Sequence, residues 1–74
     1  MNVIVWSKDA CQYCTMAKAL LESRGIPFEE RKIGYDGWDR DQLLASIPTA
    51  KTMPQIVVNG DAIGGYTELK GILG

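Results

Sequence analysis

The sequence predicts a single α/β domain over residues 1–74, in which a four-stranded mixed sheet is flanked by three helices (β-α-β-α-β-β-α). Three observations predict this class. Residues 3–6 form an apolar, β-branched run, typical of a strand buried on both faces. A helical pattern and a second strand follow closely, which favours a right-handed βαβ unit with parallel strands. Finally, Asn59-Gly60 between two apolar runs is a strong hairpin signal.

The first half of the chain predicts a strand, a helix and a second strand. A polar turn over residues 7–10 precedes a helix over residues 11–24, where apolar side chains recur at the helical period and Gly25 supplies a C-terminal stop. The next strand is expected over residues 29–33. Pro27 stands just before it, where its missing N–H costs no ladder bond.

The second half predicts a helix, the hairpin and a last helix. Apolar residues from Trp38 to Ile47 are enough for a helix over residues 38–47, and an irregular segment bracketed by two prolines follows. The hairpin strands are expected at residues 56–58 and 61–63. Gly64-Gly65 ends the second of them, and residues 66–73 form a short last helix.

Composition and charge exclude several classes of function. The net charge is −1 and the basic residues are scattered from Lys8 to Lys70, so no positive field exists to hold a phosphate backbone. No stretch approaches the roughly 20 apolar residues that span a bilayer, and the N-terminal apolar run is too short for a signal peptide. We therefore expect a cytoplasmic monomer that binds neither nucleic acid nor membranes.

The pair Cys11 and Cys14 carries the strongest chemical signal. The pair lies where a buried strand gives way to a helix, and a helix N-terminus offers unpaired N–H groups and a partial positive charge that favour a thiolate. Cys11 is therefore predicted as the nucleophile. Cys14 lies about one turn deeper on the same helix face, where it can resolve a mixed disulfide. The spacing predicts thiol–disulfide exchange.

A Cys-x-x-Cys pair has two other common uses. Zinc needs four ligands, and a chain with no histidine and no third cysteine would need a second copy to supply them. A purely structural pair of buried cysteines is the other reading, although a lasting disulfide is not expected in a reducing cytosol. We therefore expect no metal.

From Asn2 to about Leu69 the sequence resembles the glutaredoxins, whose fold is thioredoxin-like. Three motifs carry the resemblance: Lys8 three residues before the dithiol, Thr52-Met53-Pro54 as the family's cis-proline segment, and Gly64-Gly65-Tyr66-Thr67-Glu68 as its double-glycine turn into the last helix. Gln12 stands where proline is the commonest family residue, Trp6 replaces a tyrosine and Met53 a valine. Gln12 bears on the reduction potential and leaves the reaction type unchanged.

The resemblance implies that glutathione, an anionic tripeptide with two carboxylates, reduces the protein as a co-substrate. The residues expected to bind it are Lys8, Tyr13, Lys51, Thr52, Met53, Pro54, Gly65, Tyr66 and Thr67. Both lysines can meet a carboxylate or be plain solvated side chains. The Met53 backbone can pair with the substrate as an added strand does, even if its side chain belongs to the core.

Thr67 in the last helix and Tyr13 in the dithiol motif can each have either of two roles. The amides that open the helix after Gly65 suit a second carboxylate, while Thr67 can instead cap its own helix. Tyr13 can pack over the substrate or shield the disulfide. The sequence assigns no role to Tyr35.

Three functions follow from these residues. The leading one is glutathione-dependent reduction of protein disulfides, with ribonucleotide reductase as a family-level partner, and of glutathione mixed disulfides. A second is a redoxin that takes electrons from thioredoxin reductase. The third is a dimer that binds an iron–sulfur cluster through Cys11 of each chain and two glutathiones.

Overall fold

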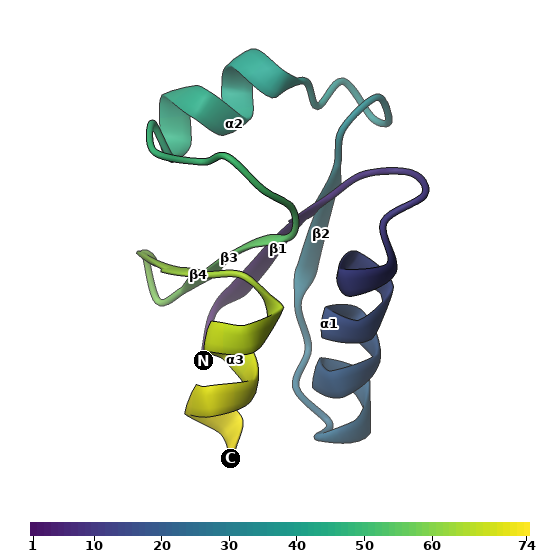
Figure 1. The fold of residues 1–74 in the computed structure, drawn as a ribbon, viewed down its shortest axis with the longest axis vertical. Helices are drawn as coiled ribbons and strands as arrows, with labels where there is room; N and C mark the ends of the chain where they lie inside the picture. Colours follow the sequence, from purple (N-terminus) through teal and green to yellow (C-terminus); the bar gives the residue numbers. More distant parts are fainter.

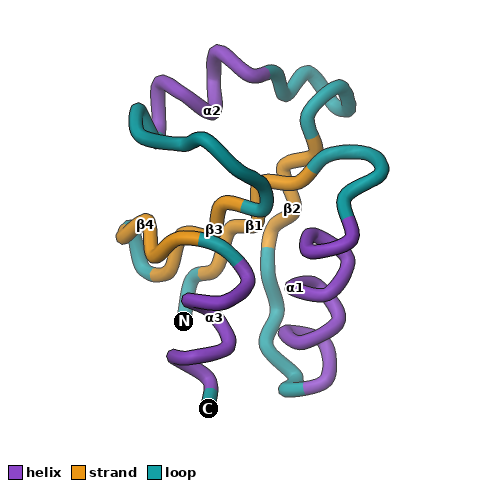
Figure 2. The backbone as a smooth tube through the Cα atoms, viewed as in Figure 1, coloured by secondary structure: helices purple, strands orange, loops and turns teal.

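The computed structural model describes all 74 residues, and its sheet is the predicted four-stranded mixed sheet. The strands are β1 (Val3–Ser7), β2 (Glu29–Lys32), β3 (Gln55–Val58) and β4 (Asp61–Gly64), in the spatial order β2-β1-β3-β4. β1 pairs with β2 in parallel and with β3 antiparallel, and β4 closes the hairpin with β3. The predicted element order is therefore confirmed (Figures 1 and 2).

The three helices are α1 (Gln12–Ser23), α2 (Arg40–Ser46) and α3 (Tyr66–Leu73). Alternate side chains of β1 point to opposite faces of the sheet. On one face Val3 and Val5 join buried residues of α1 and α3, namely Ala17, Leu21 and Leu69. On the other face Trp6 packs with Leu43 and Ile47 from the α2 region. The central strand is thus covered on both faces, as its apolar run predicts.

The second helix begins two residues later than predicted. Asp39 is its N-cap: the Asp39 carboxylate accepts from the Gln42 N–H at 2.8 Å, and the Gln42 side chain accepts from the Asp39 N–H at 2.8 Å. This capping box satisfies two helix-end donors and starts the helix at Arg40. Trp38, predicted inside the helix, lies before it with its ring edge-on to Trp6, at a centroid distance of 5.4 Å.

The hairpin and the end of α1 follow local turn chemistry. Asn59 and Gly60 have φ values of 51° and 86°, the paired positive values that a two-residue hairpin turn requires. Gly25, just past α1, has φ 66°, which confirms it as the C-terminal stop. Residues 8–11 connect the end of β1 to the start of α1 at one end of the sheet (Figure 1), and Cys11 and Cys14 lie at this start of α1.

Candidate active site

Cys11 and Cys14 are joined by a disulfide at the start of α1, with their Cα atoms 5.2 Å apart. Cys11 is the N-cap of the helix, and its Sγ accepts a hydrogen bond from the Cys14 N–H at 3.2 Å. Cys14 is buried with 1% of its surface exposed, while Cys11 is partly exposed. The geometry brings together what the spacing predicted: one accessible sulfur at a helix N-terminus and a second one behind it. A thiolate formed on Cys11 would retain that backbone donor.

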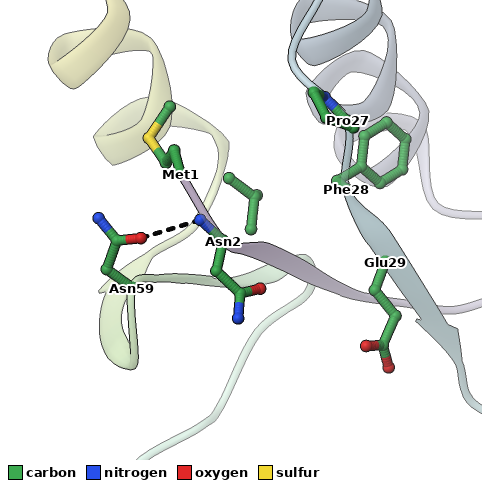
Figure 3. A pocket seen from close by; sticks show the side chains of 7 residues that line it. Met1, Asn2, Pro27, Phe28, Glu29 and Asn59 are labelled. Carbon is green, nitrogen blue, oxygen red and sulfur yellow. Dashed lines mark hydrogen bonds between the residues drawn. The ribbon is translucent and has the colours of Figure 1, made fainter.

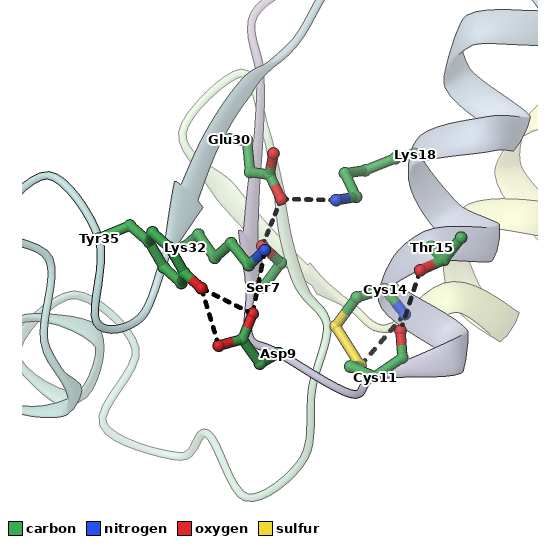
Figure 4. Close-up of polar contacts among 9 residues, drawn as sticks. All are labelled: Ser7, Asp9, Cys11, Cys14, Thr15, Lys18, Glu30, Lys32 and Tyr35. Carbon is green, nitrogen blue, oxygen red and sulfur yellow. Dashed lines mark hydrogen bonds and ion pairs between the residues drawn. A yellow bond between two sulfur atoms is a disulfide. The ribbon is translucent and has the colours of Figure 1, made fainter.

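The turn that leads into Cys11 is held by a polar cluster. The Asp9 carboxylate accepts from the Tyr35 hydroxyl, which lies 2.9 and 3.0 Å from its two oxygens, and pairs with Lys32 Nζ at 3.1 Å (Figure 4). The Tyr35 hydrogen bond and then the Lys32 ammonium hold the pKa of Asp9 below its ordinary value. The same carboxylate raises the pKa values of Tyr35 and Lys32. Sequence reasoning missed this cluster.

A second polar cluster ties α1 to the sheet behind the dithiol. Glu30 Oε2 accepts from the Ser7 hydroxyl at 2.6 Å and from Lys18 Nζ at 2.7 Å (Figure 4). The Lys18 hydrogen bond, followed by that of Ser7, lowers the pKa of Glu30. Ser7 is fully buried at the end of β1, so Glu30 satisfies a hydroxyl that would otherwise lack a partner. The three groups come from β1, β2 and α1.

A groove of about 340 Å³ lies beside the dithiol motif. Its lining residues are Tyr13, Thr52, Met53, Pro54, Gly65, Tyr66, Thr67 and Glu68. The Met53–Pro54 peptide bond is cis, as the resemblance implies. Tyr13, which the sequence places over the substrate or the disulfide, is 58% exposed. Its ring lies 6.0 Å from that of Tyr66, so two aromatic rings flank the groove.

Seven of the nine predicted glutathione-binding residues line this groove, and the other two, Lys8 and Lys51, do not. Both lysines are exposed. Lys51 borders a small neighbouring hollow that shares Thr52 and Met53 with the groove. Glu68 also lines the groove; the sequence placed it in the double-glycine motif but not among the glutathione-binding residues. Its carboxylate accepts from the Gly65 N–H at 2.7 Å and so caps α3.

Because Gly65 is the N-cap of α3, Thr67 does not cap its own helix, which removes one of the two roles considered for it. The first amides of an α-helix have no partner within the helix. Those of Tyr66 and Thr67 therefore remain available at the groove wall, beside the Glu68 carboxylate.

A larger hollow of about 720 Å³ lies at the start of β1 (Figure 3). The dithiol follows the other end of that strand. The hollow is lined by Met1, Asn2, Val3, Pro27, Phe28, Glu29 and Asn59. The Asn2 N–H donates to Asn59 Oδ1 at 2.8 Å across one side of it. Glu29 is the only charged side chain that lines this hollow, and none of the lining side chains is a nucleophile. We assign it no chemistry.

No three histidine, cysteine, aspartate or glutamate side chains lie close enough together to hold a metal ion. None of the three helices has the length and apolar character needed to cross a membrane.

A mixed sheet with a dithiol at the N-terminus of its first helix and a cis-proline beside it defines a thioredoxin-like thiol–disulfide oxidoreductase. Comparison with known proteins narrows the class. Residues 3–63 match the glutaredoxin family. Glutaredoxin 3 of Escherichia coli K12 is 37% identical over 68 residues, which cover 92% of this chain and 81% of that protein. The chain therefore belongs to the glutaredoxin family.

Solved structures agree with this assignment. Glutaredoxin 1 of Francisella tularensis, solved with cacodylate, superimposes with a TM-score of 0.80 at 30% identity and covers 97% of this chain and 91% of its own. A buckwheat glutaredoxin, solved as a complex with glutathione, superimposes with a TM-score of 0.72 at 26% identity, covering 93% of this chain and 64% of its own.

Proposed function

We propose that this protein uses glutathione to reduce protein disulfides and glutathione mixed disulfides, with Cys11 as the attacking thiol and Cys14 as the resolving thiol. The observation that carries the proposal is the groove beside the dithiol, bounded by the Met53–Pro54 backbone on one side and the start of α3 on the other. A concave site with a few convergent backbone groups suits a small peptide. The buckwheat relative, solved with glutathione, supports this choice of ligand.

The exchange proceeds in balanced steps. The Cys11 thiolate attacks a substrate disulfide, forms a mixed disulfide and releases one substrate sulfur as a thiolate, which takes up a proton. Cys14 then loses its proton and attacks the Cys11 sulfur. This step releases the second substrate thiol and forms the Cys11–Cys14 disulfide seen here. The substrate gains two electrons and the protein loses two.

Two glutathione molecules return the electrons. The first attacks the Cys11 sulfur, which forms a Cys11–glutathione mixed disulfide and frees the Cys14 thiol. The second attacks the glutathione sulfur of that mixed disulfide, which releases glutathione disulfide and restores the Cys11 thiolate. A glutathionylated substrate protein enters at the mixed-disulfide stage, so its reduction needs Cys11 alone.

The groove has complementary groups for each part of glutathione. Its cysteinyl backbone would lie antiparallel along Met53, since an extended backbone can pair as an added strand. One carboxylate would meet the amides of Tyr66 and Thr67 at the start of α3. The Glu68 charge opposes an anion there, but its hydrogen bond from the Gly65 N–H partly offsets that charge. Lys8 and Lys51, which are exposed and lie outside the groove lining, would attract the other carboxylate through their charge.

A coupled assay tests the electron donor. The oxidised protein is offered either glutathione with glutathione reductase, or thioredoxin reductase, with NADPH consumption followed in both. We expect rapid turnover of a glutathione mixed disulfide with the first system and little with the second. If thioredoxin reductase reduces the protein faster than glutathione does, the proposal fails. Cys11→Ser serves as the inactive control.

A further inference from the structure

The Asp9 cluster joins the turn before Cys11 to the segment that follows β2. Tyr35 and Asp9 are separated by 26 residues, and Lys32 ends β2, so the cluster crosses between two otherwise separate connections (Figure 4). The Lys32 ammonium also lies 4.5 Å from the centroid of the Tyr35 ring. Each of the three groups therefore touches the other two. The Asp9 carboxylate is held from two sides by donors of different kinds.

The turn that this cluster holds has a strained backbone. Ala10, between Asp9 and Cys11, has φ 52°, in the left-handed region that residues with a side chain rarely occupy. Such a conformation persists where the surrounding contacts over-determine it. The direction of the chain as it leaves Ala10 sets how Cys11 arrives at its N-cap position, where its Sγ meets the Cys14 N–H. Anchoring Asp9 therefore anchors the nucleophile one residue beyond Ala10.

The cluster also controls a negative charge next to the nucleophile. The first turn of α1 contains no acidic residue, so Asp9 is the acid nearest to Cys11 along the chain. A carboxylate released from its partners could turn towards the positive helix end and compete with the Cys11 thiolate for it. Lys32 compensates the charge and the Tyr35 hydroxyl keeps the carboxylate turned away from the helix.

We propose that Tyr35 and Lys32 are positioning residues that act through Asp9 to hold the turn presenting Cys11 to its substrates. The inference rests on the proposed function in one respect, the role of Cys11 as the attacking thiol. It assigns a role to Tyr35, for which the sequence offered none.

The test measures the Cys11 thiol directly and uses no glutathione. In the reduced Cys14→Ser background only one thiol remains, and its rate of alkylation by iodoacetamide against pH gives the thiolate titration. Tyr35→Phe removes only the hydroxyl, and Lys32→Met removes only the charge. Each should raise the pKa of Cys11, so that alkylation below the titration midpoint slows about two- to threefold, the effect of one nearby exposed charge.

Other charged groups around the dithiol remain unchanged in these variants. They are Lys8 in the same turn, Lys51 ahead of Pro54, Glu68 on α3, and the Lys18–Glu30 pair between α1 and β2. A difference between parent and variant therefore reports the Asp9 cluster. Thermal unfolding is recorded in parallel, because a merely structural role would lower the midpoint temperature without moving the thiol titration.

Two comparisons make the result decisive. Lys70→Met, the matched control, removes an exposed lysine near the end of α3 and should leave the titration unchanged. In an Asp9→Ala background, Tyr35→Phe should have no further effect, because the carboxylate through which Tyr35 acts is gone. The proposal is overturned if Tyr35→Phe and Lys32→Met titrate like the parent, or if the Tyr35→Phe shift persists without Asp9.

Failure of the inference can be told apart from failure of the proposed function. A protein that glutathione does not reduce, but whose Cys11 titration shifts in Tyr35→Phe, refutes the function and retains the positioning role. A protein that glutathione reduces, but whose Cys11 titration is unshifted in Tyr35→Phe, retains the proposed function and refutes the positioning role.

Discussion

Gly65 lies where the start of α3 approaches the backbone of Pro54, and a substitution there perturbs the width of the groove beside the dithiol. A Cβ added at Gly65 would lie 3.3 Å from the Pro54 carbonyl oxygen and 3.6 Å from Glu68 Oε1. The backbone at Gly65 has φ −107° and ψ −153°, an extended conformation that other residues adopt. The obstacle is therefore the Pro54 carbonyl. Gly64 is different, since its φ of 116° itself favours glycine.

The expected loss in kcat/KM follows from how far the added Cβ displaces the two walls of the groove. Ordinary van der Waals contact begins at 3.4 Å, so Gly65→Ala moves the two groove walls apart by a few tenths of an ångström. A misplacement of about 1 Å can cost about 100-fold in rate, so a third of that predicts a loss of about three- to fivefold in kcat/KM for glutathione. The branched side chain of Gly65→Val demands more room, and we expect a loss of about tenfold or more.

The assay is the glutathione-coupled reduction of a small mixed disulfide, with urea unfolding as the companion measurement. Gly71→Ala is the matched control in the same helix, because a Cβ there has nothing within 4 Å. It should leave kcat/KM unchanged and stabilise the protein by about 0.5–1 kcal/mol, the usual gain for alanine over glycine in a helix. If Gly65→Ala matches the parent in kcat/KM, the approach to Pro54 does not shape the groove.

Three further predictions test the dithiol, the lysines and the Glu30 cluster. Cys14→Ser should still reduce glutathione mixed disulfides but lose most reduction of protein disulfides, and loss of both activities would contradict the assigned roles. Lys8→Ala combined with Lys51→Ala should raise the apparent KM for glutathione severalfold, since each exposed contact is worth about 0.2–1 kcal/mol, and an unchanged KM would make both lysines solvent-facing only. The pKa of Glu30 is lowered by Lys18 when the protein folds, so the stability it contributes is present above the ordinary value of 4.5 and is lost as the pH falls through the lower folded value. Glu30→Gln should therefore unfold with a shallower loss of stability on acidification below about pH 5, measured by urea unfolding across pH, and an unaltered acid slope would refute the linkage.

The elements of this fold follow from patterns that are local in the chain. The hairpin was predictable because Asn59-Gly60 has the positive φ values that a two-residue turn needs, whatever surrounds it. Cys11 was placed correctly because a strand-to-helix joint must have an N-cap. Even the error at Trp38 has a local cause: Asp39 to Gln42 is a capping-box pattern that marks the start of α2, whereas apolar periodicity alone extends the helix back to Trp38.

The hydrogen bonds and ion pairs between surface side chains could not be predicted from the sequence, because they depend on the tertiary structure. Asp9 meets Tyr35 and Lys32 only because β1 and β2 are parallel neighbours, which brings the connections after both strands to the same end of the sheet. Charged side chains on a surface follow no sequence periodicity from which such an ion pair could be predicted.

The sequence by itself therefore determined the order of the elements, the dithiol and its place at a helix N-terminus, because backbone preferences and apolar periodicity act over a few residues. Only the tertiary structure decided that Glu68 also lines the groove, that Lys8 and Lys51 lie outside its lining, and how closely Gly65 approaches Pro54. Those distances depend on strand order and on the packing of α3 against the sheet. They join residues that are far apart in the chain, and no local pattern encodes them.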